Sequence, residues 1–337
     1  MIIPFFITHA GCPHQCVFCN QKSITGKNKP PEASSLHPSI SRYLEAHRDK
    51  KAVQVAFYGG SFTALPIEDQ ISYLESVQPF IRSGDIESIR LSTRPDTITP
   101  DILAVLKQYG VTTIELGAQS MDDKVLLLSG RGHSAADTVI AVALLREYHF
   151  FVGLQLMPGL PGDTPETFQE TVSKVIALRP DFVRIYPALV IKDTPLAERY
   201  RAGEYSPLSL DDAVLLCHKA MARFEQAGIE VIRVGLQPTA ELERPGTILA
   251  GPWHPAFRQL VESSRFLEKM CSLLSTSDQA GTVTLVVNPA DISTVIGQKR
   301  QNINAIKVRY GRDVKVLADA RVPAGSVNRC IPAQDTL

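Results

Sequence analysis

Short apolar runs alternate with segments of helical periodicity through the first half of the chain. The runs read as buried strands, and the segments between them read as helices. The expected strands are 2–7, 53–58, 88–91, 112–116, 152–157 and 182–186. The clearest expected helices are 67–81, 101–109, 135–148 and 165–178. Such an alternation predicts an α/β fold whose parallel sheet has right-handed crossovers, either an open six-stranded barrel or a doubly wound sheet.

The pattern changes after about residue 235. Four prolines fall within residues 236–256, and a helical stretch covers 256–274. Residues 276–281 are small and polar, as in a linker. We therefore expect three parts: a barrel at 1–235, a linker with a helical extension at 236–280, and a small α+β module at 281–337. Within the module the expected order is strand 282–287, helix 289–295, turn 297–300, helix 301–310 and strand 314–317, with a frayed tail from residue 323.

Charge and hydropathy exclude some partners. Lys plus Arg equals Asp plus Glu at 35 each, so any basic surface must be local. No apolar run reaches the length of about 18 residues that a membrane span needs. The apolar start, Met1 to Thr8, has no basic residue before it and reads as a strand rather than a signal peptide. These features predict a cytoplasmic protein without a membrane partner.

Three of the six cysteines lie within eight residues, directly after the first expected strand. Cys12, Cys16 and Cys19 have the spacing C-x₃-C-x₂-C. Three thiolates on one short loop can bind three irons of a cubane cluster and leave the fourth iron open for catalysis. The alternative is a zinc loop completed by His9 or His14, although zinc sites usually pair two C-x₂-C knuckles. The other cysteines, Cys217, Cys271 and Cys330, are expected not to be ligands.

The cysteine loop resembles that of the radical S-adenosylmethionine (SAM) superfamily. Phe18 precedes the third cysteine, and the continuation Cys19-Asn20-Gln21 is similar to the radical SAM domain of the catalytic subunit of Elongator. A more distant resemblance is to oxygen-independent coproporphyrinogen oxidase. The likeness covers roughly residues 1–260. It implies a partial (β/α)6 barrel, a 4Fe-4S cluster, reductive cleavage of SAM to a 5′-deoxyadenosyl radical, and an electron donor such as flavodoxin or ferredoxin.

Further motifs of this resemblance fall at the ends of the expected strands, where parallel α/β sheets carry their chemistry. The SAM contacts that it implies are Phe18 beside the adenine, Gly59, Gly60 and Ser61 at the amino group, Ser92 and Gln119 near the sugar, Arg131 at the carboxylate, and Gln155 inside the barrel. The coproporphyrinogen oxidase pattern has a carboxylate near Ser92 that this chain lacks. For Arg94 two roles remain open: it binds an anion, or it forms a structural salt bridge. The role of Glu115 is open, and Tyr58 and Tyr186 are expected to be core residues.

The C-terminal module resembles a KH-type RNA-binding core. KH domains clamp backbone phosphates with a Gly-x-x-Gly loop, and here Gly297-Gln298-Lys299-Arg300 occupies that turn, with arginine in place of the second glycine. Residues 281–337 contain eight basic and four acidic residues. The local excess of positive charge favours contact of Lys299 and Arg300 with RNA. The alternative is a solvated helix face on a stabilising domain.

Three functions remain open from the sequence. The first is a radical SAM enzyme that modifies RNA, with tRNA as the expected partner. The second is radical SAM chemistry on a small molecule or tetrapyrrole. The third is a non-enzymatic, metal-dependent RNA-binding protein. No segment after residue 260 is long enough for the acetyltransferase domain of the Elongator subunit. Although the chain resembles that subunit, it is therefore not expected to carry out the acetyl transfer needed for carboxymethylation of wobble uridine.

Overall fold

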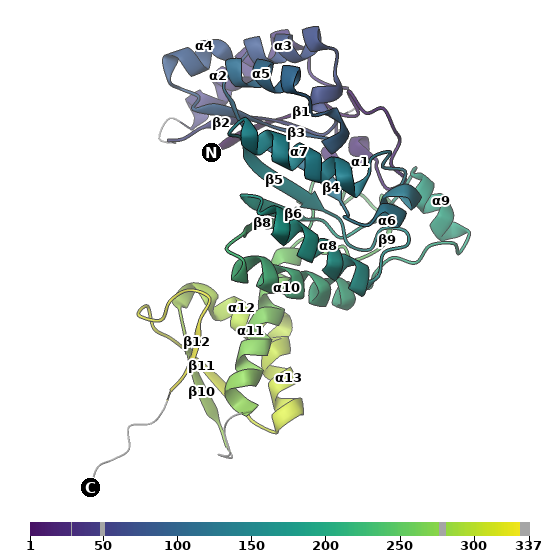
Figure 1. Cartoon of the computed structure of the whole chain (residues 1–337). Coiled ribbons are helices and arrows are strands. Elements are labelled where there is room, and N and C mark those ends of the chain that lie inside the picture. The colour runs from purple at the N-terminus through teal and green to yellow at the C-terminus, as the bar shows by residue number, and fades with distance from the viewer. Residues whose placement is uncertain (28, 48–50, 276–280, 331–337) are drawn as a thin grey trace. The chain divides into compact units, whose positions relative to one another are not determined.

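A curled parallel sheet of seven strands forms the centre of the first part of the molecule, in the order β1-β2-β3-β4-β5-β6-β8 (Figure 1). The computed structural model describes residues 1–27, 29–47, 51–275 and 281–330. The strands of this sheet are β1 (Ile2–Phe6), β2 (Gln54–Tyr58), β3 (Ser88–Thr93), β4 (Val111–Gln119), β5 (Phe151–Leu156), β6 (Phe182–Ile185) and β8 (Glu230–Val234). The expected α/β half-barrel is confirmed.

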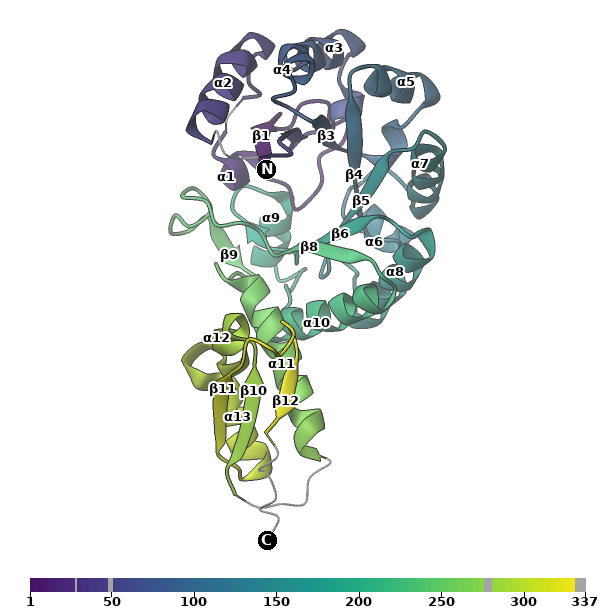
Figure 2. The same cartoon turned by 90° about the vertical axis from the view of Figure 1, so that its left-hand side faces the viewer.

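Helices connect the strands and cover the outer side of the curled sheet, so the opposite side faces inward (Figure 2). The covering helices are α2 (Leu36–Ala46), α3 (Ile67–Glu75), α4 (Gln78–Ser83), α5 (Pro100–Gln108), α7 (Ala135–Glu147), α8 (Pro165–Leu178) and α10 (Leu210–Gln226). Three shorter helices also belong to the connections between strands, namely α1 (Gln21–Thr25), α6 (Asp123–Leu128) and α9 (Pro195–Arg201). A separate antiparallel pair joins β7 (Val190–Ile191) to β9 (Ile248–Ala250).

Local capping explains where two of the outer helices begin. The Thr164 hydroxyl accepts a hydrogen bond from the Thr167 backbone N–H, and Pro165 occupies the first turn of α8, where its missing N–H costs nothing. At α7, the Ser134 side chain and the Asp137 carboxylate cap each other's backbone N–H groups. These hydrogen bonds hold the pKa of Asp137 below its ordinary value.

The longest strand, β4, carries the most completely buried residues of the sheet. Every residue from Thr113 to Gln119 is buried, and the Glu115 side chain has no exposed surface. β4 pairs in parallel with β3 on one side and β5 on the other, which places Ser92 and Gly153 beside Glu115. A charged residue therefore stands in the middle of an otherwise apolar sheet, where it needs charged partners.

Two sequence expectations about this region are wrong in detail. The helix expected at 67–81 is broken into α3 and α4, because Pro79 lies in the first turn of α4 and cannot continue a helix from before it. The sheet has a seventh strand, β8, which the sequence reading did not include. Its half-exposed centre and charged residues Glu230 and Arg233 give it a weak apolar pattern.

The chain divides into two compact units. Unit 1 comprises Met1–Ala213 and Ala220–Pro255, and unit 2 comprises Val214–Lys219 and Ala256–Leu337. Unit 2 contains α11 (Phe257–Ser275), β10 (Val283–Val287), α12 (Ile292–Ile296), α13 (Gln301–Tyr310), β11 (Val314–Ala318) and β12 (Val327–Arg329). The linker expected at 276–281 lies, apart from Gly281, outside the described residues.

Unit 2 has the β–α–α–β order of a KH-like core. Its sheet has the order β11-β10-β12, with β10 parallel to β11 and antiparallel to β12. The tail expected to fray from residue 323 therefore contributes a paired strand, which is a correction. Asn302, almost fully buried, donates hydrogen bonds to the Ser263 oxygens and to the Val295 carbonyl, and so ties the start of α13 to α11 and α12.

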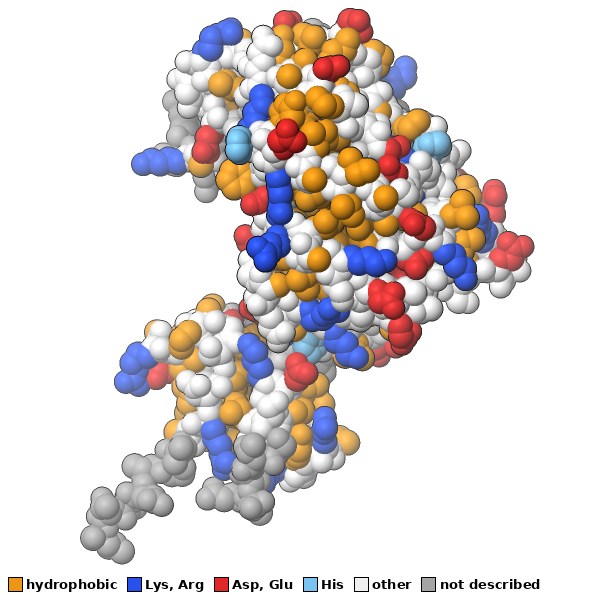
Figure 3. Space-filling model, viewed as in Figure 1, with side chains coloured by type: hydrophobic (Ala, Val, Ile, Leu, Met, Phe, Trp, Pro, Cys, Tyr) orange, Lys and Arg blue, Asp and Glu red, His pale blue; other side chains and the backbone are white. Residues whose placement is uncertain are grey.

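The outer face of unit 1 exposes several apolar side chains. α7 is apolar around most of its circumference, and Val139 and Ile140 are 44% and 64% exposed. Orange hydrophobic side chains are accordingly spread over this face between blue and red charged groups (Figure 3). No helix within the described ranges combines the length and the apolar character that crossing a membrane would require.

Candidate active site

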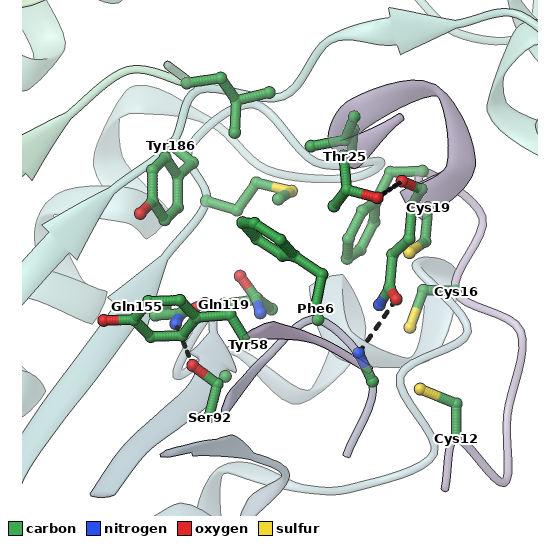
Figure 4. A pocket seen from close by; sticks show the side chains of 18 of the residues that line it. Phe6, Cys12, Cys16, Cys19, Thr25, Tyr58, Ser92, Gln119, Gln155 and Tyr186 are labelled. Carbon is green, nitrogen blue, oxygen red and sulfur yellow. Dashed lines mark hydrogen bonds between the residues drawn. The ribbon is translucent and has the colours of Figure 1, made fainter. Parts of the chain in front are cut away.

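The carboxyl ends of the parallel strands meet around one cavity of 680 Å³ inside unit 1. Cysteines from the loop after β1 lie on one side of it, and Tyr58, Ser92, Gln155 and Tyr186 lie on the other (Figure 4). The lining includes these members of the sequence-predicted site: Cys12, Cys16, Cys19, Phe18, Gly59, Gly60, Ser61, Ser92, Gln119, Arg131 and Gln155. One cavity thus collects the predicted residues of unit 1 from six separate segments.

The three clustered cysteines share the loop between β1 and α1, and all are free thiols. The Cys19 backbone N–H donates to the Cys16 carbonyl at 3.1 Å, and this tight turn directs the thiols to the same cavity. Within the described residues, no group of three or more His, Cys, Asp or Glu side chains is arranged to hold a single metal ion. Three thiols on one loop that open on a cavity are a donor set that fits an iron–sulfur cluster with three cysteine ligands.

Burial raises the pKa of two of these thiols, Cys12 and Cys19. Desolvation, together with the nearby Cys16 and Cys12 sulfurs, raises the pKa of Cys19 to about 12. Burial also raises the pKa of Cys12, although a hydrogen bond with Ser61 and the charges of Arg131 and Arg94 oppose the shift. The thiols of Cys12 and Cys19 are therefore expected to lose their protons only when a positive metal centre compensates the charge.

Gln21, to which the sequence motif alone assigns no role, connects the cysteine loop to the next strand end. Its Oε1 accepts hydrogen bonds from the His9 backbone N–H at 2.5 Å and from the Gly60 backbone N–H at 3.0 Å. The Gln21 backbone N–H in turn donates to His9 Nε2 at 3.2 Å. One side chain therefore satisfies two backbone donors and sets the distance between the cysteine loop and the glycine turn.

The glycine turn after β2 comes very close to the backbone of the cysteine loop. Gly60 has φ +32°, and a Cβ at this position would lie 2.4 Å from the Ala10 carbonyl oxygen and 2.5 Å from that of Ile7. Since both contacts are with backbone atoms, they cannot move aside cheaply. The hydroxyl of Ser61 follows at once and lies 3.7 Å from Cys12 Sγ.

Arg131 and Gln119 bring polar groups into the lining of the cavity. Arg131 donates from Nη1 to Cys16 Sγ at 3.2 Å and from Nη2 to the Gly117 carbonyl at 2.5 Å. Gln119 ends β4 with φ +67°, and its buried Oε1 has no hydrogen-bond partner within the described part of the chain. A Cβ at Gly117 would lie 2.9 Å from Gln119 Nε2. The missing side chain at Gly117 thus makes room for both polar groups.

A charged network lies behind the far wall of the cavity, and no sequence motif predicted it. Glu115 receives ion pairs from Arg90 at 2.6 Å and from Arg184 at 2.8 Å. The Tyr58 hydroxyl donates to Glu115 at 3.2 Å, and Gln155 Nε2 lies 3.3 Å from the same carboxylate. Burial and the Glu115 charge raise the pKa of Tyr58 to about 12, so its hydroxyl stays protonated.

Two residues expected in the core, Tyr58 and Tyr186, line the cavity instead. Their hydroxyls lie 3.0 Å and 3.3 Å from the Arg184 guanidinium. Arg94 also lines the cavity. Its guanidinium donates two hydrogen bonds to the Asp96 carboxylate, at 2.8 Å and 2.9 Å. Of the two alternatives for Arg94, the structure therefore shows the salt bridge.

The two residues predicted to bind RNA belong to unit 2. Lys299 and Arg300 are exposed at the turn before α13 and have φ +48° and +62°. Neither is among the residues that line the cavity. The cavity and the turn are thus separate features of the molecule.

A model of the Radical SAM superfamily matches residues 6–175, which is half of the chain. The chain belongs to the radical SAM superfamily. A second model, the Radical SAM C-terminal domain, matches residues 180–266. Enzymes of this superfamily bind a 4Fe-4S cluster and SAM, and the radical SAM chain is accordingly an enzyme. Both matches end before β10, so the KH-like core of unit 2 lies beyond them.

Curated relatives of this radical SAM chain include a tRNA uridine(34) acetyltransferase of Methanocaldococcus infernus, 28% identical over 255 residues, which are 63% of this chain and 47% of the relative. The corresponding protein of Dehalococcoides mccartyi is 26% identical over 230 residues, or 58% and 50%. The chain therefore spans about half the length of these relatives. Protein YhcC of Escherichia coli is 27% identical over 262 residues, which are 75% of this chain and 80% of YhcC.

Solved structures show the same fold. The archaeal Elp3 of Methanocaldococcus infernus superposes with a TM-score of 0.62 at 22% identity, covering 80% of this chain and 63% of that one. Coproporphyrinogen III oxidase (HemN) of Escherichia coli, described as a radical SAM enzyme, superposes with a TM-score of 0.50 at 20% identity, covering 67% and 53%. The expected relation to the Elongator catalytic subunit is confirmed at the level of family and fold.

Proposed function

We propose that Cys12, Cys16 and Cys19 hold a 4Fe-4S cluster and that the enzyme cleaves SAM reductively to modify RNA, with tRNA as the substrate class. The observation that carries the first half is the common cavity of three free thiols, the glycine turn and Arg131. The chemistry that the bound groups would supply is the cleavage of the SAM sulfonium to methionine and a 5′-deoxyadenosyl radical. The residues of the chain itself bind the cluster and SAM, orient them, and shield them from solvent.

The proposed SAM contacts follow from the donors and acceptors that line the cavity. Arg131 presents a permanent positive charge for the methionine carboxylate, and the glycine turn at Gly59 and Gly60 allows close approach to the amino group. The unpartnered Oε1 of Gln119 is an acceptor for a sugar hydroxyl. Phe18 offers an apolar surface to the adenine, next to Val125 and Leu160. Ser61 supports the amino-group site beside Cys12.

Ser92 and Gln155 are proposed to complete the sugar side of the site. Gln155 Nε2 lies 3.3 Å from Ser92 Oγ, so the two side chains hold each other in place at adjacent strand ends. Apolar side chains of Phe6 and Met157 line the same cavity and limit the access of water. Such a lining keeps solvent and dissolved reactants away from a reactive intermediate.

RNA as the substrate is supported by the names of the curated relatives and by the basic turn of unit 2. Two of them are tRNA uridine(34) acetyltransferases. Lys299 and Arg300 are proposed to contact phosphates of the RNA backbone. The free thiols fit a reducing, cytoplasmic location, and a flavodoxin or ferredoxin is the proposed electron donor.

A small-molecule substrate is the second candidate. A coproporphyrinogen-III oxidase-like protein of Bacillus subtilis, HemZ, is 29% identical over 188 residues, which are 52% of this chain and 37% of HemZ. A substrate screen separates the candidates, because RNA and porphyrinogen substrates give different products from the same cleavage reaction. Hydrogen loss from a porphyrinogen, with no change in bound tRNA, would favour this second function over the first.

The proposal is tested by anaerobic reconstitution of the full chain with iron and sulfide. With dithionite and SAM, the wild-type protein is expected to form 5′-deoxyadenosine, and Cys16→Ala is expected to abolish this product and the cluster absorbance. Cys330→Ser, which alters an exposed thiol outside the loop, is the matched control and should keep both. Zinc instead of iron in the purified protein, without 5′-deoxyadenosine, would support the non-enzymatic reading and contradict the proposal.

A further inference from the structure

The cavity carries an excess of positive charge. Four arginines line it, namely Arg94, Arg131, Arg184 and Arg233, whereas no aspartate or glutamate is among its described lining residues. Arg94 is neutralised by Asp96, which lies just outside the lining. Arg131 contacts Cys16 Sγ and so lies where the proposed cluster thiolates gather. Arg184 and Arg233 remain without an assigned ligand.

Arg184 belongs to the wall opposite the cysteines. It bonds to the hydroxyls of Tyr58 and Tyr186, which lie across the cavity from Cys12, Cys16 and Cys19 (Figure 4). The cavity therefore has two cationic ends. A single SAM carboxylate accounts for one of them at most.

The charge of the Arg184 end is unbalanced beneath the cavity surface. One carboxylate, Glu115, is shared by the two guanidiniums of Arg90 and Arg184. The exposed fractions of these three side chains are 0%, 9% and 12%. Because a buried charge without compensation is costly, an anion in the cavity would stabilise this arrangement.

Two hydrogen-bond donors of this wall are open to such an anion. Arg184 Nη1 carries two hydrogens, and among the residues that the structure describes it donates to the Tyr186 hydroxyl alone, at 3.3 Å. The Tyr186 hydroxyl accepts there, so its own hydrogen is free to point into the cavity. Arg233, bonded to Gln237 at 3.2 Å, adds a third donor group to the lining.

We infer that the Arg184–Tyr186 wall is a subsite for a compact anionic group of the substrate, a carboxylate or a phosphate, separate from the site of the SAM carboxylate. The inference rests on the proposed function, since it names the chemistry that the substrate must bring to the same cavity. Guanidinium and phenol donors together suit a planar carboxylate or a phosphate because they offer charge and direction at once.

The test uses the reconstituted full chain and two probes, inorganic phosphate and acetate, followed by ³¹P and ¹³C line broadening. Saturable binding of one or both is expected, and the tighter probe identifies the anion. Arg184→Met should weaken it about tenfold or more, and Tyr186→Phe about threefold. Arg82→Gln, an exposed arginine on α4, should leave it unchanged. In Arg184→Met, Glu115 still has Arg90 as a charged partner, so the variant is expected to fold. If Arg184→Met does not fold, Tyr186→Phe provides the test, because it removes only the hydroxyl and keeps the aromatic ring.

Repeating the titration with saturating SAM distinguishes the subsite from the SAM site. Phosphate or acetate binding that persists with SAM supports a separate subsite, whereas complete competition overturns the inference. Equal binding by wild type and Arg184→Met, or no saturable binding of either probe, also overturns it. The anion titration needs no turnover, so a failure of the proposed SAM cleavage, seen as absent 5′-deoxyadenosine, is recorded separately.

Discussion

Gly60 is the residue at which the cavity wall has least room. A Cβ would meet the Ala10 and Ile7 carbonyl oxygens at 2.4 Å and 2.5 Å, and the backbone already has a positive φ. Gly60→Ala is therefore expected to lower the free energy of unfolding by about 3 kcal/mol, from overlap together with backbone strain. It should also lower the iron content after reconstitution. Urea unfolding and iron analysis measure the two effects.

Gly84 provides the matched control for this substitution. It ends α4 with φ +81°, and no other described residue has an atom within 4 Å of the position of its Cβ. Gly84→Ala should cost about 1 kcal/mol from strain alone and should leave the iron content unchanged. An equal loss of stability in both variants would show that overlap with the cysteine loop is not what Gly60 avoids.

His133 predicts a dependence of stability on pH. Burial, followed by the charges of Arg131 and Arg94, lowers its pKa from 6.5 to about 4, and Asp96 opposes this only in part. Between these two pH values His133 is protonated in the unfolded chain and neutral in the folded chain. Stability is thus full above about pH 6.5 and declines by about 2–3 kcal/mol as the pH falls to 4.

The measurement for His133 is urea unfolding of the metal-free protein across this pH range. His133→Gln removes the titrating group, so the difference in the free energy of unfolding between wild type and variant should change with pH in this window. Asp137 also faces this region, and its pKa is lowered mainly by hydrogen bonds from Ser134, which both proteins keep. A difference that is constant from pH 7 to 4 would contradict the assignment.

Three strands of unit 1 depend on one buried carboxylate. Glu115 on β4 joins Arg90 on β3 and Arg184 on β6. Glu115→Gln would leave two buried guanidiniums without a counter-charge and is expected to destabilise the protein by about 3–5 kcal/mol. Urea unfolding measures this loss. Glu87→Gln, an exposed carboxylate just before β3, is the control and should change stability by less than about 0.5 kcal/mol.

A variant that replaces the whole network separates packing from charge. Arg90→Met combined with Arg184→Met and Glu115→Leu removes all three charges at similar volume, and its stability should recover much of the loss seen in Glu115→Gln. A triple variant that is no more stable than Glu115→Gln would indicate that the three residues act through shape rather than charge.

The same network shows which elements of the site a sequence can predict. The cysteine loop is local, and the motifs after β2 and β4 could be placed together because parallel strands end at one edge. The pairing of Glu115 with Arg90 and Arg184 depends on strand register and on residues 25 and 69 positions away. No local pattern carries that information. The break at Pro79, by contrast, was readable from the proline alone.

At the scale of the whole molecule, the chain joins a family-wide half-barrel to a KH-like core that neither family model covers. The order of elements in unit 2 was predictable, since the turn at Gly297 and the two short helices have clear local patterns. The strand β12 was not predictable, because its three residues have almost no pattern and depend on pairing with β10. Function follows the same division: unit 1 determines how a radical could form, and unit 2 is proposed to select RNA.

That division predicts that RNA binding and SAM cleavage can be separated by substitution. Lys299→Ala combined with Arg300→Ala removes two cations from the exposed turn and should weaken tRNA binding about tenfold or more. The dependence of log affinity on log salt should fall by about one to two units of slope, while 5′-deoxyadenosine formation without RNA should be unchanged. Lys315→Ala, an exposed lysine on β11, is the control within unit 2. Filter binding at several salt concentrations measures affinity and slope, and equal losses in the control and the double variant would assign the binding to net charge rather than to the turn.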